Sequence, residues 1–289
     1  MPRFNVEFYK PRVLAPENTT FSGVLNTILD LAGVDRIRAG TDPAAILTIH
    51  RHEHEIFGEA ARIRMDDLPS VIDVADGRRH DLDVEEHEGL GEEVHFLYDA
   101  DLDVIAVQTR GHFRAADLAN LFADLSDTTL EFQVMLSPDA VQKMQRVEQV
   151  TKINFKLARP RDLEGQRQPA LNRVFQQIDQ FDGMTAKMEI TVGRARNRWL
   201  SRGAVEQIIT AFQERPDEFQ SLSISGAIRE NEGQNAAAHP AIIDFIKGRL
   251  LYTEDVERRG RGKRLDTEGC RSALRRAIRQ HRPYLRRLR

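Results

Sequence analysis

The sequence of 289 residues has one cysteine, Cys270, and therefore cannot form an internal disulfide. A lone thiol is typical of a protein in a reducing compartment. The chain also lacks an apolar run of about 18 residues, the minimum for a membrane-spanning helix. Its first ten residues, MPRFNVEFYK, contain no apolar segment of the kind found in secretory signals. We therefore expect a protein of the cytoplasm.

Common catalytic signatures are missing as well. The sequence contains no phosphate-binding GxxxxGK[ST] loop, no GxSxG nucleophile turn and no HExxH zinc motif. Cys270 falls on the apolar side of a predicted helix, which favours buried packing over work as a nucleophile. We therefore predict a protein that is not an enzyme and that has no catalytic residues and no cofactor.

The length suits two domains of ordinary size, and the sequence pattern changes near residue 128. Before it, apolar alternation predicts strands at 45–57 and 60–65 around Gly58, and a hairpin from 94–98 and 104–109. After it, strand and helix patterns alternate. We predict an α+β protein with a strand-rich domain at 1–127. The domain at 128–289 would carry alternating strands and helices on a mixed sheet and end in a basic helix.

Charge is distributed very unevenly along the chain, although the net charge is only −3. Residues 1–127 hold 12 basic and 25 acidic side chains, whereas residues 258–289 hold 13 basic and 2 acidic ones. Such asymmetry indicates a polyanionic partner for the basic half. The alternative is self-neutralisation, in which the acidic half docks on the basic half.

The predicted C-terminal helix concentrates this positive charge. Cys270, Ala273, Leu274, Ala277 and Ile278 share one helical face, and arginines cover the other. Spacings of three and four place guanidinium groups above one another, as a row of phosphates requires. The alternatives are a solvated face and a dock for the acidic domain; a membrane-surface helix is less favoured because the apolar face is small.

Two further basic segments precede this helix. KINFKLARPR places two lysines on one face of a predicted strand, and GRARNRWLSRG gathers arginines around Trp199 before a predicted helix, whose N-terminus would favour anions. Trp199 is either a base-stacking residue or a partly buried anchor. The residues predicted to contact nucleic acid are Lys152, Lys156, Arg159, Arg161, Arg194, Arg196, Arg198, Arg202, Arg271, Arg275, Arg276, Arg279 and Arg282.

The histidines of HRHEHE suggest a different chemistry. On a strand, His50, His52 and His54 would share a face and could ligate a metal such as Zn²⁺. A metal-dependent nuclease would take further carboxylates from elsewhere, and the acidic stretch 81–93 offers them. The competing interpretation is a polar, solvent-facing strand without metal.

The segment Glu88–Gly111, EGLGEEVHFLYDADLDVIAVQTRG, resembles the RexA-type proteins of phage-exclusion systems. In both, a short Glu-Leu-Gly segment precedes an apolar strand, an acidic turn, a second strand and a helix. The resemblance implies a DNA-binding homodimer that senses phage infection and signals to a membrane-channel partner in abortive infection. The arginine-rich tail and the histidine triplet depart from that family.

We therefore expect a DNA-binding sensor in antiviral defense, with duplex DNA as the first choice and single-stranded nucleic acid as an open alternative. The basic residues lack neighbouring Asn or Gln at helical spacing, so contacts to phosphate and weak sequence preference are expected. A metal-dependent nuclease and a protein–protein adaptor are the competing hypotheses.

Overall fold

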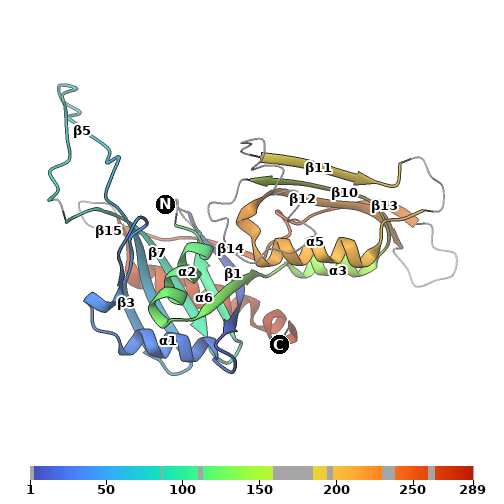
Figure 1. The fold of residues 1–289 in the computed structure, drawn as a ribbon, viewed down its shortest axis with the longest axis horizontal. Helices are drawn as coiled ribbons and strands as arrows, with labels where there is room; N and C mark the ends of the chain where they lie inside the picture. The colour runs from blue at the N-terminus through green and yellow to red at the C-terminus, as the bar shows by residue number, and fades with distance from the viewer. Residues whose placement is uncertain are drawn as a thin grey trace. The chain divides into compact units, whose positions relative to one another are not determined.

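The chain folds into two compact units in the computed structural model (Figure 1). The structure describes residues 3–85, 87–109, 113–158, 185–193, 198–229, 238–259 and 264–288. Unit 1 combines Met1–Glu131 with Tyr252–Arg289, and unit 2 is Phe132–Leu251. Each unit has its own sheet and its own apolar core.

Unit 1 is built on an eight-stranded sheet with the order β14-β1-β8-β7-β4-β3-β2, and β9 also pairs with β1. The strands are β1 (Arg3–Ala15), β2 (Ile37–Arg38), β3 (Ala44–His52), β4 (Glu55–Arg64), β7 (Leu90–Asp99), β8 (Val104–Gln108), β9 (Thr129–Val134) and β14 (Leu251–Asp255). The predicted hairpin of β7 and β8 is confirmed. The expected turn at Gly58 is wrong: the chain reverses at Glu53 and His54, and Gly58 lies inside β4 opposite Phe96. A glycine is needed there because an added Cβ would lie 2.3 Å from the Phe96 ring.

Both faces of this sheet are covered by helices. Successive strand residues point to opposite faces, so Phe96 and Tyr98 lie on one side of β7, and His95 and Asp99 lie on the other. The first side receives α1 (Phe21–Asp30) and α2 (Ala115–Ser126), through ring contacts of Phe21 with Tyr98 and of Phe96 with Phe122. The second side receives α6 (Thr267–Leu285), whose His281 packs edge-on against Phe8.

The apolar face that the sequence predicts for helix α6 is confirmed. The five residues expected on its apolar face, Cys270, Ala273, Leu274, Ala277 and Ile278, are all buried. The Asp266 side chain caps the helix by accepting a hydrogen bond from the Gly269 amide at 2.9 Å. Its apolar face packs against β1, β7 and β8, which explains why the C-terminal residues join unit 1 instead of the domain expected at 128–289.

Smaller elements complete unit 1. These are the 3-10 turns η1 (Val34–Arg36) and η3 (Arg286–Leu288), and the two-residue strand pairs β5 (Val71–Ile72) with β6 (Arg79–His80) and β15 (Arg258–Arg259) with β16 (Arg264–Leu265).

Unit 2 is a four-stranded sheet with helices on one side (Figure 1). Its elements are α3 (Pro138–Arg146), β10 (Val147–Ala158), β11 (Thr185–Thr191), α5 (Arg202–Glu214), η2 (Pro216–Glu218), β12 (Phe219–Arg229) and β13 (Ala238–Asp244), with the strand order β11-β10-β12-β13. Phe212 of α5 packs edge-on against Phe219 and Phe245. These rings and the inward residues of β10, Ile153, Phe155 and Leu157, form the core between sheet and helices.

The predicted α+β class is confirmed, with one difference in the second sheet. We expected a mixed sheet, but β10–β11, β10–β12 and β12–β13 are all antiparallel. Strands β11 and β12 do run in the same direction, as the strand–helix–strand pattern around α5 predicts. They are not neighbours, because β10 lies between them. Within the described residues, no helix combines the length and the apolar character that crossing a membrane requires.

Candidate functional site

The arginines of α6 are held by carboxylates of unit 1. The Arg275 Nε donates a hydrogen bond to Glu55 Oε2 at 2.6 Å, and Arg276 Nη2 lies 2.6 Å from Glu254 Oε1. Arg271 lies over the Phe57 ring at 5.7 Å from its centroid and 3.8 Å from Glu268. These guanidinium groups are therefore already neutralised within their own unit.

The fourth paired arginine, Arg282, approaches two carboxylates at once. Its guanidinium nitrogens lie 3.8 Å from Asp99 Oδ2 and 3.5 Å from Asp101 Oδ2. Of the five arginines predicted on this face, only Arg279 is exposed without an ion pair to another described residue. The arrangement corresponds to self-neutralisation, the alternative to a row of arginines open to phosphate.

The histidine triplet does not form one face. His50 and His52 are exposed on β3, whereas His54 lies in the turn between β3 and β4. The alternation expected of a continuous strand ends at this turn, so His54 points elsewhere. The carboxylates near His54 come from the last residue of β7, Asp99, and from the turn that follows it, Asp101, not from the stretch 81–93.

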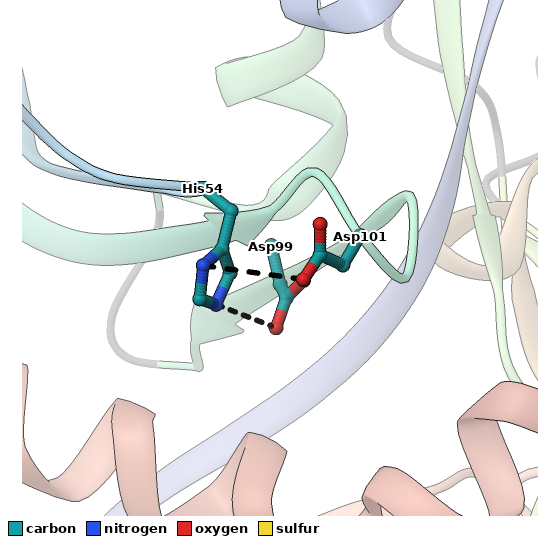
Figure 2. A group of neighbouring side chains, drawn as sticks. All are labelled: His54, Asp99 and Asp101. Atoms are coloured by element: carbon teal, nitrogen blue, oxygen red, sulfur yellow. Dashed lines mark ion pairs between the residues drawn. The ribbon is translucent and has the colours of Figure 1, made fainter.

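Two hairpin turns meet at one end of the unit 1 sheet and bring His54, Asp99 and Asp101 together (Figure 2). Strand β4 pairs with β7 with Glu55 opposite Asp99, and the Ala100 amide donates to the His54 carbonyl at 2.9 Å, which fixes the two turns side by side. His54 Nε2 lies 3.9 Å from Asp99 Oδ2, and Nδ1 lies 3.9 Å from Asp101 Oδ2. Imidazole and carboxylate groups this close are potential ligands for a divalent metal.

Asp99 is the unusual member of this group because its side chain is fully buried. Its Oδ1 accepts a hydrogen bond from the Leu102 amide at 3.1 Å, but its Oδ2 has no hydrogen-bond partner. Burial raises the pKa of the Asp99 carboxyl, and the Leu102 hydrogen bond and the nearby Arg282 and His54 offset only part of that effect. Sequence reasoning missed Asp99 and Asp101, although their place after a buried apolar strand in YDADLD was a usable signal.

The second candidate surface is the side of the unit 2 sheet that faces away from α3 and α5. We call it the open face, because no helix among the described residues covers it. Strand β10 contributes Lys152, Asn154 and Lys156 to it. The register places Lys187 of β11 and Ser221 of β12 directly opposite Lys156, on either side. The neighbouring outward residues of β12, Ser223 and Ser225, carry hydroxyl groups.

The two central lysines of the open face differ from Lys152 in their partners. Lys152 Nζ forms an ion pair with Glu189 Oε2 at 2.9 Å. Lys156 and Lys187 make no ion pair with any other residue in the described ranges, and Lys187 is exposed. The open face therefore presents two adjacent positive charges, Lys156 and Lys187, beside the neutralised pair Lys152–Glu189 and the hydroxyl groups of β12.

The remaining predicted contact residues are only partly placed. Arg198 is exposed, Trp199 is 49% exposed, and Arg202 pairs with Glu206 at 2.9 Å within α5. Arg159, Arg161, Arg194 and Arg196 lie outside the described residues. Of all the basic residues predicted, Lys152 and Lys156 are therefore the pair that the structure places on one open face.

Comparison with known proteins adds a family without an assigned role. A family model described as "Family of unknown function (DUF6731)" matches residues 48–276, which is most of the chain. No curated protein matches the sequence.

Proposed function

The chain belongs to this family of unknown function, and we propose that it binds the phosphate backbone of DNA through the open face of unit 2. Duplex DNA is the proposed ligand, and binding requires no catalysis and no cofactor. The observation that carries the proposal is the facing pair Lys156 and Lys187.

Like charges directly opposite each other in a sheet destabilise it. The Cβ atoms of directly opposite residues are about 5 Å apart, and two ammonium groups at that separation in water would repel by roughly 0.8 kcal/mol. A phosphate between the two ammonium groups would turn that repulsion into attraction. Ser221, opposite Lys156, adds a hydroxyl donor for the same oxygens. These features support a backbone contact rather than the reading of bases.

The pairing of the α6 arginines limits the size of this contact. Arg271, Arg275, Arg276 and Arg282 already have carboxylate partners, so binding through them would first break those ion pairs. The proposal therefore rests on a few phosphate contacts in unit 2. Binding should be weak, largely independent of sequence and strongly dependent on salt.

The resemblance of Glu88–Gly111 to RexA-type proteins supports a biological setting for this activity. In that setting the chain would act in the cytosol as a homodimeric sensor of phage infection. DNA binding would be coupled to a membrane-channel partner in phage exclusion. This setting is a separate part of the proposal, and it can fail without affecting the contact at the open face.

The test measures binding to a random-sequence duplex by fluorescence anisotropy between 50 and about 300 mM salt, a range in which phosphate contacts weaken strongly. Each phosphate contact makes the slope of log affinity against log salt steeper by about 0.9. Lys156→Gln/Lys187→Gln should therefore make the slope shallower by about 2 and weaken the affinity at 0.15 M salt about 30-fold.

The matched control is Lys143→Gln/Arg146→Gln, which removes the same charge from α3, on the other side of the sheet. Its slope and affinity should stay close to those of the unmodified chain. Equal losses in the two double variants would mean that only net charge matters, and the open face would not be the site.

A further inference from the structure

The cluster of His54, Asp99, Asp101 and Arg282 in unit 1 has no part in DNA binding as proposed above, and its chemistry indicates another ligand. The three potential ligand atoms come from the end of β7 and from two hairpin turns that the sheet register places side by side, and all lie within 4.8 Å of one another. Figure 2 shows the His54 ring beside the two carboxylates, with a dashed line from one ring nitrogen to Asp99 and from the other to Asp101.

The separations are too long for hydrogen bonds and close to those between ligands of one metal ion. His54 Nε2 lies 3.9 Å from Asp99 Oδ2 and Nδ1 lies 3.9 Å from Asp101 Oδ2, both beyond the usual hydrogen-bond limit, and a metal ion would take only one of the two ring nitrogens. Two ligands at about 2.1 Å from a tetrahedral ion are roughly 3.4 Å apart. A shift of about 0.5 Å, within the range of side-chain rotation, would bring His54 and a carboxylate to that geometry.

A second observation concerns Asp99 Oδ2. This atom is completely buried in a side chain with no exposed surface, and it has no hydrogen-bond donor. A buried carboxylate oxygen is costly unless a cation or a donor compensates it. The nearest cation, Arg282, is 3.8 Å away, and its own Nε is also buried without a hydrogen-bond partner. Oxygen and guanidinium thus lie near each other without the direct bond that would satisfy both.

The charges of the cluster also favour a cation. Two carboxylates face one guanidinium, so one negative charge remains when His54 is neutral. A divalent cation in place of Arg282 would bring the group to neutrality. Nitrogen together with carboxylate oxygen suits a transition ion such as Zn²⁺ or Mn²⁺ better than Mg²⁺ or Ca²⁺, which prefer oxygen alone.

We propose that His54, Asp99 and Asp101 form a binding site for a divalent transition metal ion, and that Arg282 is the competing cation at the same two carboxylates. Metal binding then exchanges the guanidinium for the ion at Asp99 and Asp101. Because Arg282 belongs to α6 and the ligands belong to the sheet and its hairpin turns, the exchange also releases the two ion pairs that Arg282 makes from the helix.

The experiment titrates the full chain, free of affinity tags and treated with a chelator, with Zn²⁺ in competition with a chromophoric chelator. The unmodified chain should bind one equivalent. His54→Gln and Asp101→Asn should each lower the affinity about tenfold or more, because each removes a ligand. His52→Gln is the matched control: it removes an exposed imidazole two residues away and should leave the affinity unchanged.

Arg282→Gln tests the competition and should raise the affinity for Zn²⁺, because the carboxylates lose their resident cation. Should this variant unfold, the comparison of His54→Gln with His52→Gln still decides the question. The proposal is overturned if the unmodified chain binds no Zn²⁺, or if His54→Gln and His52→Gln bind it equally well, which would indicate adventitious binding by surface histidines.

Discussion

Replacing Arg275 by Gln separates the two roles that the arginines of α6 can have. The change removes the hydrogen-bonded ion pair with Glu55, in which Nε and Oε2 are 2.6 Å apart. The side chains of Arg275 and Glu55 are only 31% and 18% exposed, so water replaces the lost partner incompletely. A hydrogen bond to a charged group contributes about 1.5–3 kcal/mol, and partial exposure favours the lower end. We expect the free energy of unfolding to fall by about 1.5 kcal/mol.

Thermal unfolding followed by circular dichroism measures this loss. For a unit of this size, about 1.5 kcal/mol corresponds to a decrease in Tm of roughly 3–6 °C. In a double-mutant cycle with Glu55→Gln, the double variant should lose less than the sum of the single losses, with a coupling energy of at least about 0.5 kcal/mol. The control is Arg279→Gln, at an exposed position of the same helix, where the change should stay within about 0.5 kcal/mol.

The same variants also report on DNA. Since Arg275 is engaged by Glu55, Arg275→Gln should weaken DNA binding no more than Arg279→Gln does. A variant that keeps its Tm but loses DNA affinity would show that Arg275 serves phosphate and not the fold. That result would refute the assignment of the α6 arginines to internal ion pairs.

Three further predictions concern the two cores and pH. Gly58→Ala should cost about 1–3 kcal/mol of stability, measured by urea unfolding, because the new Cβ meets the buried Phe96 ring at 2.3 Å; an unchanged midpoint would contradict the close packing. Phe212→Ala should cost about 3–5 kcal/mol by the same measurement, because the ring is fully buried in unit 2. A loss below about 1 kcal/mol, roughly the contribution of one buried methylene, would contradict that burial. Burial would raise the pKa of Glu254, but hydrogen bonds from Arg276 and Tyr252 outweigh it and place that pKa below its ordinary value of 4.5. The pair with Arg276 therefore stabilises the fold at pH values above the ordinary Glu pKa, by about 0.2–1 kcal/mol at this partly exposed site. That stability is lost as the pH falls through the lowered pKa of Glu254. The titration of an ordinary Glu falls between neutral pH and pH 3. Over this range Tm should fall less in Glu254→Gln than in the unmodified chain. An unchanged dependence of Tm on pH would exclude the Glu254–Arg276 pair as a cause of that fall.

Local patterns predicted much of the fold correctly. The apolar stripe from Cys270 to Ile278 gave the C-terminal helix and its buried face, because helical spacing is encoded within a few residues. The hairpin of β7 and β8 followed from two apolar strands around a short acidic turn. In β3 and β4 the apolar pattern was recognised, but the turn was misplaced, because a glycine required by the Phe96 ring looks the same in sequence as a turn glycine.

Contacts between distant segments were beyond a single sequence. The opposite charges of the first half and the C-terminal helix fitted two outcomes, an external polyanion and internal neutralisation. For the helix, the pairing of Arg275 with Glu55, separated by 220 positions, corresponds to internal neutralisation. The His54, Asp99 and Asp101 cluster depends on β4 lying beside β7, a pairing that no local pattern specifies.

The most direct test of the central claim is a lysine acetylation footprint of the full chain with and without duplex DNA, read by mass spectrometry. If DNA lies on the open face, Lys156 and Lys187 become protected, whereas Lys143 on α3 and Lys10 on β1 react as before. Protection that is equal at all four lysines, or absent from Lys156 and Lys187 while DNA is bound, would contradict the account.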